Sequence, residues 1–219
     1  DGDWEVRDKL GNPLTPIPTP ETKPPSLNSI YALNKYDQEQ MCLMIGRAYN
    51  MPAVALRFFN IFGPYQALSN PYTGVLAIFA SRLLNNRPPL INEDGMQMRD
   101  FVSVYDVARA CRLALETPEA GGHVFNVASG CQYTILDLGK RIARALGRNI
   151  DPEITGKYRA GDIRHCFADI TKARDILGYV PRIELEEGLQ DLAAWLEGQI
   201  AYDRVAESRN ELAARGLMV

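Results

Sequence analysis

No apolar run in the sequence approaches the roughly 20 residues that a helix needs to cross a bilayer. The opening residues are charged and rich in proline, so they do not resemble a signal peptide. The net charge is only −3, and the basic residues are scattered instead of forming one stripe, which argues against a nucleic-acid-binding surface. We therefore expect a soluble, cytoplasmic protein that binds neither membranes nor nucleic acid.

Cysteine and histidine are also scarce. The four cysteines show no C-x-x-C spacing, and three of them lie in apolar stretches, so we expect buried, reduced thiols instead of disulfides or a zinc site. These are Cys42, Cys111, Cys131 and Cys166. His123 and His165 have no partner at metal-ligand spacing, so we expect structural roles for both and no metal site.

The first 28 residues contain six of the fourteen prolines and are expected to form a loop. Beyond them, apolar residues at helical spacing predict a helix from Ser29 to Asn50, and the apolar run 53–59 predicts a buried strand. A turn is expected at 60–64. Asn70 and Pro71 then predict the start of a helix that ends near residue 86.

The rest of the chain continues this alternation of helices and short strands. Ser103 and Thr134 are expected to cap helices that reach Glu116 and Gly147, and Asp106 and Asp169 are interpreted as capping residues. Strands or helices are further predicted after Pro89 and at 123–127, 169–178, 185–196 and 203–215. Such alternation is typical of an α/β fold with a largely parallel sheet.

Tyr31 and Lys35 are four residues apart, one turn along the first predicted helix and on the same face. A free phenol has a pKa of about 10, and a nearby ammonium favours the phenolate. Such a pair can take a proton from an alcohol while a nicotinamide accepts the hydride. With ten tyrosines and six lysines in the chain, one Y-x-x-x-K match is a weak signal by itself.

Further motifs follow this pair in a specific order. They are Leu56-Arg-Phe-Phe-Asn-Ile-Phe-Gly-Pro64, Asp94-Gly-Met-Gln-Met-Arg-Asp-Phe-Val102 and Gly161-Asp-Ile-Arg164. Their order and spacing resemble the nucleotide-sugar epimerases and dehydratases of the extended short-chain dehydrogenase/reductase family. The likeness covers residues 26 to about 200.

This resemblance implies a role for nine residues. Tyr31 would be the catalytic acid and base, and Lys35 would assist it and bind the nicotinamide ribose of NAD. The remaining residues would be Phe58 and Phe59 beside the nicotinamide, Asn60 at the sugar diphosphate, Asn70 and Val75 at the base, and Arg99 and Arg164 at the phosphate or ribose. Asn60 as a turn residue, Asn70 as a helix cap and Arg99 in a surface ion pair are the alternatives.

The chain contains no G-x-x-G-x-x-G, the glycine-rich turn with which this family holds the dinucleotide. We therefore expect the C-terminal part of a Rossmann-type parallel sheet with a small α/β substrate-binding domain, the N-terminal Rossmann half being absent, and no activity of this chain alone. The expected division is a Pro-rich loop at 1–28, the last Rossmann helix and strand at 29–66, a mainly nucleotide-sugar-binding domain at 67–200 and a helical tail at 201–219.

The segment from Asp3 to Glu21 resembles an insertion that precedes the active-site tyrosine in bacterial dTDP-L-rhamnose 4-epimerases. The resemblance implies an NAD-dependent 4-epimerase that acts on a dTDP-, UDP- or GDP-linked sugar, with NAD favoured over NADP. A 4,6-dehydratase, a decarboxylase or a reductase of the same family is the first alternative, and a non-catalytic nucleotide-sugar-binding fragment is the second. The family also implies a homodimer for the complete protein.

Overall fold

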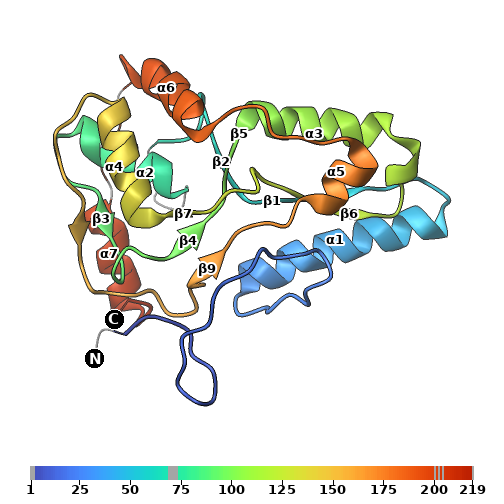
Figure 1. Ribbon diagram of the computed structural model, residues 1–219, viewed down its shortest axis with the longest axis horizontal. Coiled ribbons are helices and arrows are strands. Elements are labelled where there is room, and N and C mark those ends of the chain that lie inside the picture. Colours follow the sequence, from blue (N-terminus) through green and yellow to red (C-terminus); the bar gives the residue numbers. More distant parts are fainter. Residues whose placement is uncertain (1–2, 69–73, 200, 202, 204, 219) are drawn as a thin grey trace.

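The computed structural model describes residues 3–68, 74–199, 201, 203 and 205–218, in which helices alternate with short strands (Figure 1). The helices are α1 (Ile30–Ala48), α2 (Val75–Leu84), α3 (Val104–Glu116), η1 (Pro118–Ala120), α4 (Ile135–Ala145), α5 (Thr171–Leu177), α6 (Leu185–Leu196) and α7 (Val205–Ala214). The strands are β1 (Ala55–Phe58), β2 (Asn60–Phe62), β3 (Leu90–Ile91), β4 (Met98–Arg99), β5 (Phe101–Ser103), β6 (Val124–Val127), β7 (Tyr133–Thr134), β8 (Glu153–Ile154) and β9 (His165–Cys166). None of the helices in these ranges is long and apolar enough to span a membrane.

Most strand pairs are parallel, which confirms the expected α/β class. The parallel pairs are β1 with β6, β2 with β5, β3 with β8 and β4 with β9, while β4 and β7 are antiparallel. Parallel partners must come from distant parts of the chain because a crossover connects them.

One hydrophobic core surrounds the β1–β6 pair. Figure 1 shows these two strands between α1 on one side and α3 with α5 on the other. Phe125 and Val127 of β6 are fully buried against α3 and α5. Tyr179 closes this core, and its hydroxyl donates a hydrogen bond of 2.9 Å to the carbonyl of Ala128.

A second hydrophobic core lies between α2, α4 and α6. The four leucines that the heptad-like spacing of α6 predicts as core residues, Leu185, Leu189, Leu192 and Leu196, are all buried in it. Phe62 of β2 also belongs to this core. The expected domain division at residue 67 stays a prediction.

Three of the predicted helix starts are confirmed. Ser29, Ser103 and Thr134 are the N-caps of α1, α3 and α4, and each side-chain oxygen accepts a backbone N–H of the first turn. Asp169 accepts the N–H of Thr171 at the start of α5. Asp106 instead accepts the backbone N–H groups of Arg182 and Ile183, so it anchors the segment before α6.

Three local expectations were wrong. Residues 60–62 form strand β2 instead of a turn, because they pair with the distant strand β5. The helix expected from Asn70 begins at Val75 after the N-cap Gly74, and Asn70 itself lies outside the described residues. Cys42 and Cys131 are exposed, and Cys111 and Cys166 are only partly buried, so the expected burial of the cysteines is wrong.

The Pro-rich opening is irregular, as expected, but part of it is attached to the sheet. Thr19 forms a parallel bridge with Ala168, and its carbonyl accepts a hydrogen bond of 2.9 Å from the side chain of Asn126. The Glu21 carboxylate accepts the backbone N–H of Asn126 at 2.8 Å. This segment therefore lies beside β6 and the chain that follows β9.

The Asp100 side chain joins three segments that are far apart in the sequence. It is 0% exposed, and its carboxylate accepts hydrogen bonds from the N–H and hydroxyl of Ser129, the N–H of Gly130 and the N–H of Ala168, at 2.6 to 3.3 Å. Burial raises the pKa of this carboxyl, although the four hydrogen bonds act in the opposite direction.

Replacing Asp100 by Asn should lower the free energy of unfolding by about 2–4 kcal/mol, because an amide nitrogen would face N–H donors that have no other acceptor. Urea denaturation measures this difference. The exposed Asp151 provides the control, since Asp151→Asn removes the same charge without a buried partner. Equal stabilities of the two variants would contradict the assigned role of Asp100.

Candidate active site

Tyr31 and Lys35 lie in the first turns of α1. Ser29 begins the helix by accepting the N–H of Ala32 at 3.1 Å, which fixes the first turn. The ammonium of Lys35 lies 5.8 Å from the centroid of the Tyr31 ring, within the range of a cation–π contact. Tyr31 is 73% exposed, so its hydroxyl can meet a ligand from solution.

An ion pair fixes α1 to the neighbouring strand. The Arg57 guanidinium in β1 donates two hydrogen bonds of 2.7 and 2.8 Å to the carboxylate of Glu39 in α1, a bidentate geometry. A third donor of Arg57 binds the carbonyl of Glu21 at 3.2 Å. The position of Tyr31 relative to the carboxyl end of β1 therefore depends on a partly buried ion pair and not on apolar packing alone.

The predicted residues after β1 lie at that carboxyl end. Phe58 is 45% exposed and Phe59 is partly buried. The backbone N–H and the side-chain amide of Asn60 both donate to the carbonyl of Asp100, at 3.1 and 3.0 Å. Asn60 is thus held against Asp100, the residue that follows Arg99. In Figure 1 the carboxyl end of β1 and the amino end of α1 both point toward the lobe of α2, α4 and α6.

Arg99 lies at the end of β4 and shares a carboxylate with a residue that the sequence analysis missed. Its guanidinium is 3.6 Å from the Asp162 carboxylate, and the guanidinium of Arg159 is 3.7 Å from the same oxygen. Arg159 precedes the turn at Gly161, whose φ of +78° favours glycine. An arginine two positions before a Gly-Asp turn is the signal that could have identified it.

The remaining contacts of Arg99 are with main-chain carbonyls. It donates to the carbonyls of Met98 and Arg164 at 2.8 and 2.9 Å, and to that of Ile163. These bonds place the Arg99 guanidinium at the loop that precedes β9.

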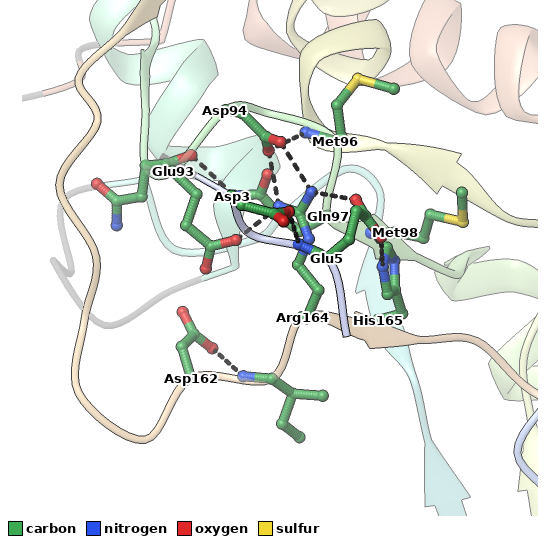
Figure 2. Close-up of polar contacts among 12 residues, drawn as sticks. Asp3, Glu5, Glu93, Asp94, Met96, Gln97, Met98, Asp162, Arg164 and His165 are labelled. Carbon is green, nitrogen blue, oxygen red and sulfur yellow. Dashed lines mark hydrogen bonds and ion pairs between the residues drawn. The ribbon is translucent and has the colours of Figure 1, made fainter. Parts of the chain in front are cut away.

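Arg164 is surrounded by three carboxylates, as Figure 2 shows. It binds Asp94 with two donors at 2.7 and 2.9 Å, Glu93 at 2.7 Å and Glu5 at 2.7 Å. Its side chain is only 9% exposed. The predicted contact between Arg164 and a nucleotide stays a prediction, and it would require a ligand to compete with these carboxylates.

The cluster changes the acid–base properties of its members. The hydrogen bond from Arg164 lowers the pKa of Glu5. Burial acts to raise the pKa of Asp94, but hydrogen bonds from Arg164 and from the N–H of Met96 outweigh it, so the pKa of Asp94 is lowered. Both carboxylates are stabilised in their ionised form.

The remaining residues considered in the sequence analysis are Val75, Asn70 and the two histidines. Val75 begins α2 and packs against the second core, and Asn70 lies outside the described part of the chain. His165 accepts the N–H of Met98 and lies 3.4 Å from Glu5, and His123 contacts the ring of Phe125. Within residues 3–68, 74–199, 201, 203 and 205–218 there is no cluster of three or more His, Cys, Asp or Glu side chains that could hold a metal ion.

The described residues thus include an exposed tyrosine–lysine pair, an asparagine at the start of a strand and two arginines around one carboxylate. The profile of the NAD dependent epimerase/dehydratase family matches residues 10–128. The chain therefore belongs to this family of NAD-dependent nucleotide-sugar epimerases and dehydratases.

Individual relatives agree with this assignment. The chain is 35% identical over 177 residues to the dTDP-L-rhamnose 4-epimerase of Burkholderia thailandensis, covering 80% of this chain and 48% of the relative. The UDP-glucose 4-epimerase of Thermotoga maritima, solved with UDP-glucose, is 36% identical with a TM-score of 0.76, covering 86% of this chain and 60% of that one. The UDP-N-acetylglucosamine 4-epimerase of Methanobrevibacter ruminantium, in complex with UDP-N-acetylmuramic acid, is 35% identical with a TM-score of 0.77, covering 86% and 59%. The chain spans about half the length of the curated relatives it matches.

The lowered pKa values of Glu5 and Asp94 predict how acid affects the cluster. A carboxyl with a lowered pKa in the folded state stabilises the protein fully above its ordinary pKa, and this contribution is lost as the pH falls through the lowered value. Arg164→Gln should therefore cost about 1–3 kcal/mol of unfolding free energy at pH 7 and clearly less at pH 3.

Urea titrations of wild type and variant at both pH values measure this change. Arg112→Gln serves as the control, because Arg112 pairs only with the exposed Glu116 on the same helix. A cost of Arg164→Gln that does not vary with pH would rule out the ionised cluster.

Proposed function

We propose that this chain carries the acid–base pair and the sugar-nucleotide site of an NAD-dependent nucleotide-sugar 4-epimerase. The observation that carries the proposal is the exposed Tyr31 with Lys35 over its ring, on a helix fixed to β1. This strand leads to Asn60, which binds the residue that follows Arg99. The activity is proposed for the whole protein, since the match covers 48% of the dTDP-L-rhamnose 4-epimerase relative.

The residues present fit an NAD-dependent oxidation of an alcohol. NAD, when bound, supplies the hydride acceptor. Tyr31 takes the proton of the sugar C4 hydroxyl and returns it when the 4-keto sugar is reduced on its other face. Lys35, whose ammonium lies 5.8 Å from the centroid of the Tyr31 ring, is proposed to bind the nicotinamide ribose.

The diphosphate is proposed to bind between Arg99 and Arg159, with Asn60 beside it. Two guanidinium groups face the single carboxylate of Asp162, so one positive charge remains uncompensated. An incoming phosphate would complete that pairing, and planar guanidinium groups bind phosphate well.

Epimerases and dehydratases share the proton transfer to the tyrosine and differ in the other residues that take part in the reaction. A dehydratase needs a further acid and base to eliminate water. The 4-epimerase names of the relatives support the first activity. Incubating the complete enzyme with UDP-glucose and dTDP-glucose decides between them, because a dehydratase releases a 4-keto-6-deoxy sugar and an epimerase does not.

Arg159→Gln should weaken the binding of UDP or dTDP by about tenfold, because one charge-assisted contact to phosphate is lost. Its stability should stay near that of the wild type, since the Arg159 side chain is half exposed. Calorimetric titration of the 219-residue chain measures the affinity. Arg112→Gln removes the same charge from a remote helix and should leave the affinity unchanged, so a similar loss in both variants would exclude a local phosphate contact.

In the complete enzyme, Tyr31→Phe should lower kcat by roughly 10²- to 10⁴-fold, because the proton acceptor is lost while the ring remains. Tyr49 is a matched control, since it caps the other end of α1 and is also 73% exposed. Tyr49→Phe should turn over at the wild-type rate. Full activity of Tyr31→Phe would remove the proposed acid and base.

A further inference from the structure

The first described residues form a strap, residues 3–8, that lies against the loop before β9. The ring of Trp4 meets that of Tyr158 edge to face, with centroids 5.7 Å apart. The Glu5 carboxylate accepts a hydrogen bond of 2.7 Å from Arg164 and lies 3.4 Å from the ring nitrogen of His165 (Figure 2). The strap therefore holds this loop at two places, one apolar and one charged.

Arg164 connects the strap to a second loop. Its other donors bind Glu93 and both oxygens of Asp94, in the turn between β3 and β4. That turn requires Gly95, whose φ is +81° and whose Cβ position would lie 3.0 Å from Leu136. The Arg164 guanidinium thus connects the loop before β9 with residue 5 of the strap and with the turn at 93–94.

The main chain at Arg164 also determines where Arg99 points. Two donors of Arg99 bind the carbonyls of Ile163 and Arg164. Any shift of the Arg164 side chain that moves this loop therefore moves the partners of Arg99. The loop also carries Asp162, which both Arg99 and Arg159 approach.

We infer that Arg164 is a positioning residue and that Glu5 of the strap, acting through it, sets the geometry of Arg99 for a nucleoside diphosphate. This inference rests on the proposed sugar-nucleotide site. Three carboxylates around Arg164 give the cluster a net negative charge, which disfavours direct contact with a phosphate. Arg164, which its sequence motif predicts to bind the nucleotide, instead orients Arg99, which binds it.

The test compares two single-charge changes within the strap. Glu5→Gln removes the charge that faces Arg164. Asp3→Asn removes a charge two residues away that pairs with Arg7 and keeps the oxygen that accepts the N–H of Glu5. Each folded 219-residue variant is titrated with UDP and with dTDP. For the nucleotide that binds the wild-type chain, Glu5→Gln should lower the affinity three- to tenfold, and Asp3→Asn should leave it unchanged.

A double-mutant cycle separates positioning from general destabilisation. In an Arg99→Lys background, Glu5→Gln should weaken nucleotide binding by less than twofold, because the group that it positions is already changed. A loss of the same size in both backgrounds, or wild-type affinity of Glu5→Gln alone, would overturn the inference.

Hydrogen exchange without ligand provides a readout that does not depend on the proposed function. Amides of residues 158–166 should exchange faster in Glu5→Gln than in Asp3→Asn and wild type. If the wild-type chain binds neither nucleotide, the proposed function fails, and the positioning of Arg99 for a nucleotide fails with it. Faster exchange would then still support the strap as a clamp on this loop, whereas unchanged exchange would overturn the clamp as well.

Discussion

The carboxylate of Asp100 is the interaction on which the arrangement of this molecule depends. It is fully buried and accepts four hydrogen bonds from the chain after β6 and the chain after β9. A buried carboxylate persists only where donors replace the water that it has lost. The residues on either side of Asp100 are therefore fixed in space, and Arg99 is one of them.

The same stretch of chain also joins the two hydrophobic cores. Successive side chains of a strand point to opposite faces, and in β5 Phe101 belongs to the core of α2, α4 and α6 while Val102 belongs to the core around β6. Ser103 then caps α3. Asn60 pairs with Phe101, and Arg99 lies two residues before it, so a distortion of either core is transmitted through β5 to the proposed phosphate site.

Local rules predicted the parts of the fold that local chemistry determines. Capping hydroxyls located α3 and α4, and apolar spacing located α1 and α6, because a helix satisfies its backbone within one segment. The strand at Asn60 was missed because its hydrogen bonds depend on β5, about 40 residues further along the chain. The surroundings of Arg164 were likewise hidden, since Glu5 lies 159 positions before it.

Two arginines of one loop differ in the charges that surround them. Arg159 and the nearby Arg99 share one carboxylate, which leaves a positive charge available to an anion. Arg164, five positions after Arg159, faces three carboxylates, so a phosphate approaching it would meet net repulsion in a poorly solvated site. A sequence motif locates an arginine but does not show the carboxylates that distant segments bring to it. In the proposed site, these carboxylates decide which arginine can bind a phosphate and which one holds the loop in place.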